Sequence, residues 1–156
     1  MEITKTFYAP ARKEWRSWLR KNHKTEKEIW LVFYNKQSGK PGIPYNDAVE
    51  EALCFGWIDS TVKKIDSERR AQRFSPRNPK SSWSEMNKER ARRLIAAKKM
   101  TKAGLALLGS HHETKFKIAA DILKALKKDK ETWKNFQRFP ESYKRIRIGF
   151  IDASRN

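Results

Sequence analysis

The chain has 156 residues, and its 38% hydrophobic content and six Trp argue against a wholly disordered protein. Its net charge is +18, no apolar run approaches the roughly 18 residues of a transmembrane helix, and the first residues lack the layout of a signal peptide. The single cysteine excludes an internal disulfide and favours a reducing, cytoplasmic setting.

The N-terminal part is expected to form a helix and then a strand. Pro10 and the following residues, ARKEWRSWLRKN, predict a helix that buries Trp15, Trp18 and Leu19 and leaves Arg12, Arg16, Arg20 and Lys21 in solvent. The aromatic and β-branched run at 28–35 predicts a central strand covered on both faces. The glycines and proline of QSGKPG predict a turn after it.

A second helix and a pair of strands are predicted next. The helix begins at 45–47 with Asn46 as its N-cap, buries an apolar face that includes Cys54, and ends at Gly56. An extended segment from Trp57 to Ile65, the turn KIDSERRA and a return strand at 71–75 follow. With the strand at 28–35 they predict a small, mainly antiparallel sheet.

Helices dominate the rest of the chain. Ser84 and Thr101 are predicted N-caps, residues 110–117 read as a linker, and three short helices are predicted over 119–128, 131–139 and 140–154. The predicted fold class is α+β, with an all-helical C-terminal third. We expect residues 1–110 to form the α+β core domain and residues 111–156 to pack on it as a helical region, in one compact domain.

Two clusters, CFGWIDS at 54–60 and RFSPRNPKSSW at 73–83, indicate a candidate binding site. Arginine side chains there have the forked geometry that suits phosphate or carboxylate, and the indole rings have faces on which a base or ring stacks. We predict one ligand cleft formed by Trp57, Asp59, Arg73, Ser75, Arg77, Lys80, Trp83 and Asn87. A structural interpretation stays open beside it, in which Asp59 and Arg73 form a buried pair and Trp83 covers the core.

Other reactive residue types have simpler interpretations. Cys54 lacks an evident His partner and is predicted to be a buried structural thiol. His111 and His112 are adjacent and point apart, which predicts an exposed linker and no metal site. We interpret Asp47, Glu50 and Glu51 as charges in the first turn of a helix.

No phosphate loop, nucleophile elbow or HExxH motif is present in the sequence. The sequence therefore predicts no catalytic residue and no cofactor, and favours a protein that is not an enzyme.

The positive charge is unevenly spread, since residues 67–104 hold 12 Lys or Arg against 3 acids. A field of this size attracts nucleic acid, anionic lipid or phosphorylated ligands. Arg90, Arg92, Arg93, Lys98, Lys99 and Lys102 are expected to form a cationic band that the C-terminal helices extend. Because no nucleic-acid-binding motif accompanies it, the band predicts non-specific, salt-dependent binding or else a solvated helix face.

Three segments carry a resemblance to a known family: IWLVFYNKQSGKPGIPYNDAVEEALCFGWIDS, RFSPRNPKSSWSEMNKERARRLI and MTKAGL. They resemble the YdeI/OmpD-associated, or bacteriocin-protection, family from about Tyr8 to Leu108, and the likeness resumes more weakly from Ala119. The resemblance implies a cytoplasmic bacterial protein linked to envelope stress, antimicrobial peptides or an outer-membrane porin, without an established reaction or ligand. The expected function is therefore non-enzymatic stress protection through binding a small anionic ligand or a protein partner, and the alternative is a basic nucleic-acid-binding module.

Overall fold

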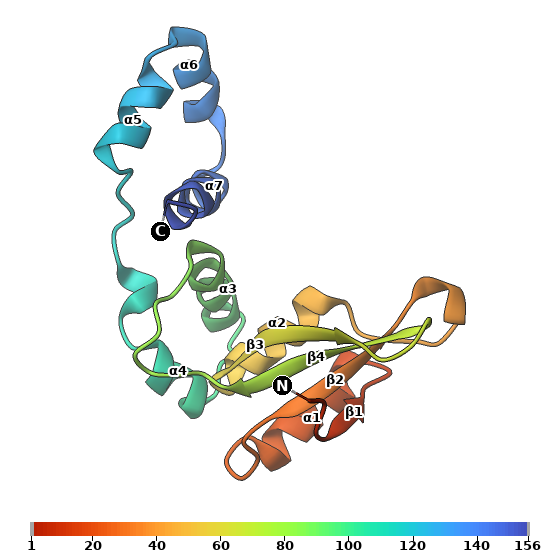
Figure 1. The fold of residues 1–156 in the computed structure, drawn as a ribbon. Coiled ribbons are helices and arrows are strands. Elements are labelled where there is room, and N and C mark those ends of the chain that lie inside the picture. The colour runs from red at the N-terminus through yellow and green to blue at the C-terminus, as the bar shows by residue number, and fades with distance from the viewer. Residues whose placement is uncertain (1, 156) are drawn as a thin grey trace. The chain divides into compact units, whose positions relative to one another are not determined.

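The computed structural model describes residues 2–155, which form the predicted α+β fold (Figure 1). The described residues contain the strands β1 (Thr6–Tyr8), β2 (Ile29–Tyr34), β3 (Trp57–Lys64) and β4 (Arg69–Pro76). They also contain the helices α1 (Arg12–Asn22), α2 (Tyr45–Cys54), α3 (Glu85–Ala96), α4 (Lys102–Leu108), α5 (Ala120–Lys127), α6 (Lys130–Arg138) and α7 (Glu141–Ala153). Short 3₁₀ turns are present at Lys36–Ser38 and His111–Glu113.

The chain divides into two compact units. Unit 1 comprises the residues up to Ser81 together with Arg93–Gly109, and it contains the sheet with α1, α2 and α4. Unit 2 comprises Ser82–Arg92 together with the residues from Ser110 onward, and it contains α5, α6 and α7. Helix α3 contributes its first eight residues to unit 2 and its last four to unit 1.

The sheet of unit 1 has the strand order β1-β2-β4-β3 and is mainly antiparallel, as predicted. Only the pairing of β1 with β2 is parallel among the described strands. Strand β1 was not predicted, because three residues are too few for an alternating pattern to stand out. The predicted turn KIDSERRA is also shorter than expected, since β4 already begins at Arg69.

One face of the sheet packs on the helices α1 and α2 (Figure 1). Phe74 lies opposite Ile29 in the register and is fully buried, with its ring centroid 5.2 Å from that of Trp15 in α1. On β2 the opposite face carries the half-buried Val32 and Tyr34. The prediction that this strand is fully covered on both faces was therefore wrong at these two positions.

Hydrogen bonds connect the C-terminal end of α2 to the residue that precedes α4. Thr101 caps α4 as predicted, because its hydroxyl accepts a hydrogen bond from the N–H of Gly104. The same residue donates its backbone N–H and its hydroxyl to the carbonyl oxygen of Cys54, at 3.0 and 2.6 Å. Gly56, which follows α2 as predicted, has φ +76°, a left-handed conformation that favours glycine.

Two local predictions about α1 and α2 were wrong. The residue before α2 is Pro44, and Asn46 lies inside the first turn, where its side chain is not the N-cap. Arg12 and Arg16 are not in solvent, since both pair with acids of α2. Trp15 and Leu19 are buried as expected from the helical stripe.

In unit 2, helices α5, α6 and α7 lie close to the predicted ranges. Ile122 of α5 and Ile148 of α7 are buried, while many other side chains of these helices stay accessible. The first half of α3 packs against α7, where Arg145 pairs with Glu89 at 2.8 Å. Across residues 2–155, none of the helices combines the length and the apolar character needed to cross a bilayer.

Candidate functional site

The eight residues of the predicted cleft belong to different units. Trp57, Asp59, Arg73, Ser75, Arg77 and Lys80 lie in unit 1. Trp83 and Asn87 lie in unit 2, where the indole ring of Trp83 stacks on His111 and the amide oxygen of Asn87 accepts a hydrogen bond from Arg90. The cleft as a whole therefore stays a prediction, and the residues of each unit are described by themselves.

Asp59 and Arg73 lie on opposite faces of the sheet. Asp59 is paired with Phe74 in the register and so shares the face of Phe74, whereas the neighbouring Arg73 points to the other side. The carboxylate of Asp59 accepts a hydrogen bond from the hydroxyl of Tyr45. Arg73 instead donates a hydrogen bond to Glu28 at 2.7 Å. The buried Asp59–Arg73 pair considered from the sequence is therefore not formed.

Arg73 is already engaged by side chains of its own face. Its guanidinium pairs with Glu28 and lies 3.3 Å from the hydroxyl of Ser60 and 3.5 Å from that of Ser75. Hydrogen bonds from Thr4 and from Arg73 lower the pKa of Glu28, although slight burial opposes this. A shallow hollow of about 670 Å³ lies here, but its wall carries Glu26 and Glu28 as well as cations, so it is a poor site for an anion.

Two other predicted residues of unit 1 are buried. The indole N–H of Trp57 donates to the carbonyl oxygen of His23 at 3.1 Å, and its ring meets Trp18 edge to face. Arg77 is only 7% exposed, and its burial lowers the pKa of its guanidinium. Lys80, by contrast, is exposed. Trp57 thus packs in the core and exposes almost none of its surface.

A pocket of about 690 Å³ lies elsewhere in unit 1, and we call it the loop pocket. Its walls are the end of β2, the segment 35–45 that leads into α2, and the tip of the β3–β4 hairpin at 64–70. This volume is within the range of pockets that hold small molecules. From the sequence, QSGKPG at 37–42 was predicted to be a turn, and no binding role was predicted for it. The available signal was the placement of Lys36 and Lys40 in a Gly/Pro loop next to an aromatic strand.

The register of the sheet places aromatic and cationic side chains of the loop pocket side by side. Arg70 lies between Phe33 on β2 and Lys64 on β3, so these three side chains share one face. The guanidinium of Arg70 lies 5.5 Å from the ring centroid of Phe33, and the ammonium of Lys40 lies 4.9 Å from that of Tyr34. Both distances are those of cation–π contacts.

The lining of the loop pocket has an excess of positive charge. It contains five Lys or Arg, namely Lys36, Lys40, Lys64, Arg69 and Arg70, against the acids Asp66 and Glu68. Asp66 pairs with Arg69 at 2.6 Å and so offsets one of these cations. The remaining excess favours an anion, while the rings of Phe33, Tyr34 and Tyr45 offer apolar surface.

Hydrogen bonds between side chains and backbone groups, and one between two backbone groups, hold the rim of the loop pocket in place. Asp66 accepts from the N–H groups of Glu68 and Arg69 across the hairpin tip. The hydrogen bond from the Arg69 guanidinium, together with these backbone bonds, lowers the pKa of Asp66. Asn35 donates its backbone N–H to Glu68 and its side-chain amide to Ser67, which ties segment 35–45 to the hairpin. The hydroxyl of Tyr8 donates to the carbonyl oxygen of Pro41.

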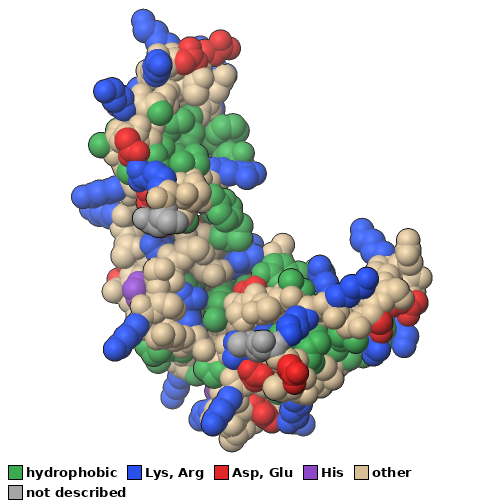
Figure 2. Space-filling view, in the orientation of Figure 1, with side chains coloured by type: hydrophobic (Ala, Val, Ile, Leu, Met, Phe, Trp, Pro, Cys, Tyr) green, Lys and Arg blue, Asp and Glu red, His purple; other side chains and the backbone are tan. Residues whose placement is uncertain are grey.

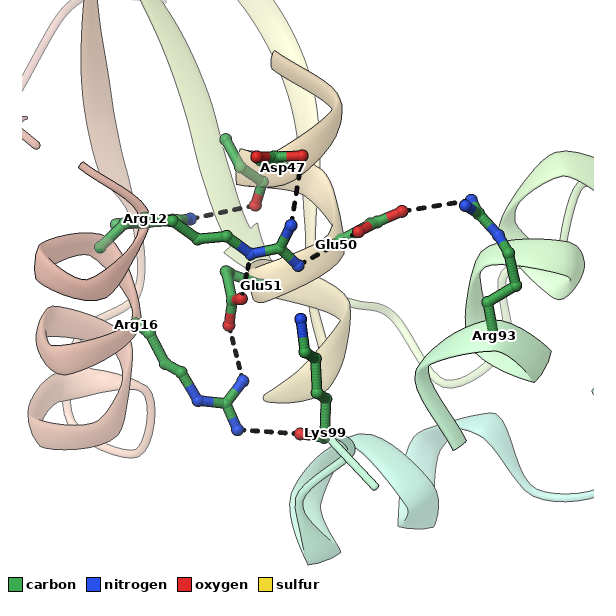
Figure 3. Close-up of polar contacts among 9 residues, drawn as sticks. Arg12, Arg16, Asp47, Glu50, Glu51, Arg93 and Lys99 are labelled. Atoms are coloured by element: carbon green, nitrogen blue, oxygen red, sulfur yellow. Dashed lines mark hydrogen bonds and ion pairs between the residues drawn. The ribbon is translucent and has the colours of Figure 1, made fainter. Parts of the chain in front are cut away.

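A second polar cluster joins α1, α2 and the end of α3 in unit 1 (Figure 3). Glu51, only 2% exposed, accepts from Arg12 at 2.5 Å and from Arg16 at 2.6 Å. Arg12 also pairs with Asp47 and Glu50, and Glu50 pairs with Arg93. The sequence-based interpretation was that these acids are simple first-turn charges of a helix. It did not predict the arginine partners of Asp47, Glu50 and Glu51.

The charges of this cluster satisfy one another, so we assign it a structural role. Burial opposes the charged form of Arg12 and Arg16, but hydrogen bonding and attraction by Glu51 raise the pKa of both groups. Arg16 also donates to the carbonyl oxygen of Lys99 at 2.9 Å. Nearby Cys54 is a buried free thiol, as predicted, and its burial raises its pKa. A thiol in that state is a weak nucleophile.

Comparison with known proteins gives a family without an assigned function. A family model described as "Domain of unknown function (DUF8412)" matches residues 7–107. No curated protein and no solved structure matches the chain. The matched range includes the whole loop pocket and the polar cluster around Glu51. The description of the family model does not name the YdeI/OmpD-associated family, so the resemblance to that family remains an expectation.

Proposed function

The chain belongs to the family of the DUF8412 domain of unknown function, and we propose that it is a non-enzymatic protein that binds a small anionic ligand in the loop pocket. The observation that carries this proposal is the pairing of cations with aromatic rings among the residues that line the pocket, in the contacts of Arg70 with Phe33 and of Lys40 with Tyr34.

The lining favours a ligand that combines a ring with an anionic group. The rings of Phe33, Tyr34 and Tyr45 provide apolar contact area for a flat group, and the cations supply charge-assisted hydrogen bonds to a phosphate or carboxylate. A phosphate alone would leave this apolar surface uncovered, and an uncharged ring would leave the charge excess uncompensated. We therefore expect a ligand with both parts to bind more tightly than either part alone.

The proposed biological role comes from the resemblance to the YdeI/OmpD-associated family. In this proposal the protein works in the cytoplasm, in a response to envelope stress or antimicrobial peptides, and the anionic ligand or an acidic protein partner is the signal that it binds. The Arg/Trp cleft predicted from the sequence remains a second proposed location for that binding.

A basic nucleic-acid-binding module is the second candidate function. Its support is the net charge of +18 together with Arg93, Lys98, Lys99 and Lys102, which are exposed in unit 1. Arg90, which the sequence placed in the same band, is buried in unit 2. Such binding would be driven by phosphate contacts, grow with the length of an oligonucleotide, and fall steeply with salt.

Titration of the full chain with three small probes tests the first proposal. We expect phenyl phosphate to bind more tightly than inorganic phosphate or benzyl alcohol, with chemical-shift changes in the amide NMR spectrum concentrated at 33–45 and 64–70. Arg70→Ala and Lys64→Ala should each weaken phenyl phosphate about fivefold or more, because each removes a cation from the wall. Lys13→Ala, which removes an equal charge from an exposed position of α1, should leave binding unchanged.

Unchanged binding by the two pocket variants would overturn the proposal. If Arg70→Ala and Lys64→Ala bind phenyl phosphate as the unaltered chain does, the loop pocket is not the site. If none of the three probes binds while a long oligonucleotide does, and that binding collapses between low and moderate salt, the nucleic-acid module replaces the small-anion proposal.

A further inference from the structure

Helix α7 in unit 2 carries an accessible stripe of aromatic and aliphatic side chains. Phe150 is 52% exposed, Ile151 is 48% exposed and Tyr143 is also exposed. Together with Arg147 they follow the spacing i, i+4, i+7 and i+8, which places them on one face of the helix. We call this set, extended by the exposed Phe139 just before the helix, the α7 stripe.

Contacts between neighbours make the α7 stripe continuous. The ring centroids of Phe139 and Tyr143 are 4.6 Å apart, and the guanidinium carbon of Arg147 lies 5.0 Å from the ring centroid of Tyr143. From Tyr143 to Ile151 the stripe runs for about 12 Å along the helix axis, at about 1.5 Å a residue. Figure 2 shows hydrophobic side chains gathered on this part of unit 2, with Lys and Arg around them.

The opposite face of α7 packs on unit 2, so the stripe is not needed to hold the helix in place. Ile148 is buried, and Arg145 pairs with Glu89 of α3. A Cβ at Gly149 would lie only 3.0 Å from the side chain of Glu85, which shows how closely α7 and α3 approach here. The stripe thus faces away from the contacts that fix α7.

The charged residue within the α7 stripe is a cation, and the acids of α7 are ion-paired. The acids of α7 are Glu141, two residues before Tyr143, and Asp152, two residues after Phe150. A separation of two residues in a helix places a side chain on the far side, and these acids pair with Lys144 and Arg155. Arg147 lies within the stripe and the exposed Arg138 precedes Phe139, so two cations lie beside the apolar groups, while Lys144 and Arg155 offset the nearby acids.

We propose that the α7 stripe docks unit 2 on an anionic lipid bilayer. Exposed apolar groups gathered into one patch indicate an interaction surface, and amphipathic helices with aromatic and aliphatic groups beside cations bind at the interface of anionic membranes. Phe150 and Ile151 would enter the acyl boundary, Tyr143 would lie at the headgroup level, and Arg147 would contact lipid phosphates. This surface is separate from the loop pocket and does not depend on it.

The composition of the stripe favours a bilayer over nucleic acid. A surface for single-stranded nucleic acid combines a track of cations with rings on which bases stack. The α7 stripe has a single cation among five residues, and the side chain of Ile151 has no flat face for stacking. Apolar burial, with attraction to negative headgroups, accounts for all five side chains.

Vesicle flotation of the full chain tests the proposal. We expect the protein to float with vesicles of phosphatidylglycerol and phosphatidylcholine and to bind pure phosphatidylcholine far less. The double variant Phe150→Ser/Ile151→Ser should lower the partition coefficient about tenfold or more, because it removes two apolar groups from the stripe. Arg147→Glu should weaken binding to the anionic vesicles only.

Two controls separate the stripe from general effects of charge and stability. Leu105→Ser removes an exposed apolar residue of α4 in unit 1 and should bind vesicles as the unaltered chain does. Lys64→Ala alters the loop pocket and should also leave flotation unchanged. Far-UV circular dichroism checks the fold of the double variant, and Arg147→Glu provides an independent test if serine at both positions disturbs α7.

Three outcomes would overturn the proposal. The first is that the unaltered chain does not float with anionic vesicles at low salt. The second is that the double variant and Arg147→Glu float as the unaltered chain does. The third is that the double variant loses binding to a single-stranded oligonucleotide, or changes from dimer to monomer in analytical ultracentrifugation, while its flotation is unaltered.

Discussion

Gly104 of α4 lies directly against the last turn of α2, so that a Cβ placed on Gly104 would be 2.7 Å from the carbonyl oxygen of Leu53 and closer still to that of Cys54. Both neighbours are backbone atoms, which cannot turn away as a flexible side chain can. The contact between α2 and α4 therefore requires the absence of a side chain at this position.

Gly104→Ala should destabilise the protein by about 2 kcal/mol or more, because α4 must shift away from α2 and strain the hydrogen bonds from Thr101 to Cys54. Urea unfolding measures the free energy. Gly42→Ala is the matched control, since a Cβ at Gly42 meets no atom within 4 Å, and it should change stability by less than about 0.5 kcal/mol. Equal stability of the two variants would contradict the predicted clash.

Glu51→Ala should destabilise the protein by about 3 kcal/mol, because it leaves the guanidinium groups of Arg12 and Arg16 without their shared buried carboxylate. Arg93→Ala removes a member of the same network whose side chain is 63% exposed, and should cost less than about 1 kcal/mol. Thermal and urea unfolding of the two variants provide the comparison. Similar losses would mean that the network is solvated and not structural.

Cys54 should resist alkylation in the folded protein. The side chain is fully buried and its pKa is raised by burial, so little reactive thiolate is available to a reagent. Iodoacetamide should react about 100-fold more slowly in buffer than in concentrated urea, and mass spectrometry of the intact chain follows the reaction. A rapid reaction in buffer would show that α2 opens readily at this end.

Glu28 should make folding stability depend on pH in the acid range. Its pKa is lowered in the folded state, so its contribution is present above its unfolded pKa of about 4.3 and is lost as the pH falls through the folded value. Glu28→Gln should therefore cost about 1 kcal/mol at neutral pH and have a smaller effect below pH of about 3. Glu113→Gln, at an exposed position, should have no comparable effect at either pH.

Arg77→Ala and Trp83→Ala distinguish the predicted Arg/Trp cleft from a purely structural role. Both side chains are 7% exposed, and we expect each variant to lower the melting temperature, with a loss of about 2–4 kcal/mol for Trp83→Ala. Binding of phenyl phosphate should be unchanged below the melting transition if the loop pocket is the site. Loss of binding at an unchanged melting temperature would instead favour the cleft.

Much of the fold was predictable because local signals and the global structure agree. The aromatic run of β2, the caps Ser84 and Thr101, and Gly56 after α2 each have a direct chemical reason, and each marks an element close to its observed boundary. The helices of unit 2 follow their apolar periodicity in the same way.

The candidate site was less predictable, because side-chain direction depends on strand register and on partners distant in sequence. A register irregularity between Asp59 and Val62 lies in β3, and alternation along a strand sends Asp59 and Arg73 to opposite faces. The spacing of Arg12 and Arg16 in α1 looked like a solvated face, and only the packing of α2 reveals Glu51 as their partner. The loop pocket combines three segments, none of which has a recognisable motif.

The hydrogen bonds from Asn35 to the hairpin and from the hairpin tip to Asp66 have a kinetic consequence. A rim that is already ordered has little conformational freedom to lose when a guest enters, so the approach of an anion is governed by diffusion in the field of the lysines and arginines. Added salt would then slow the entry of a charged guest, while residence time would report how well its ring fits against the aromatic side chains of the lining.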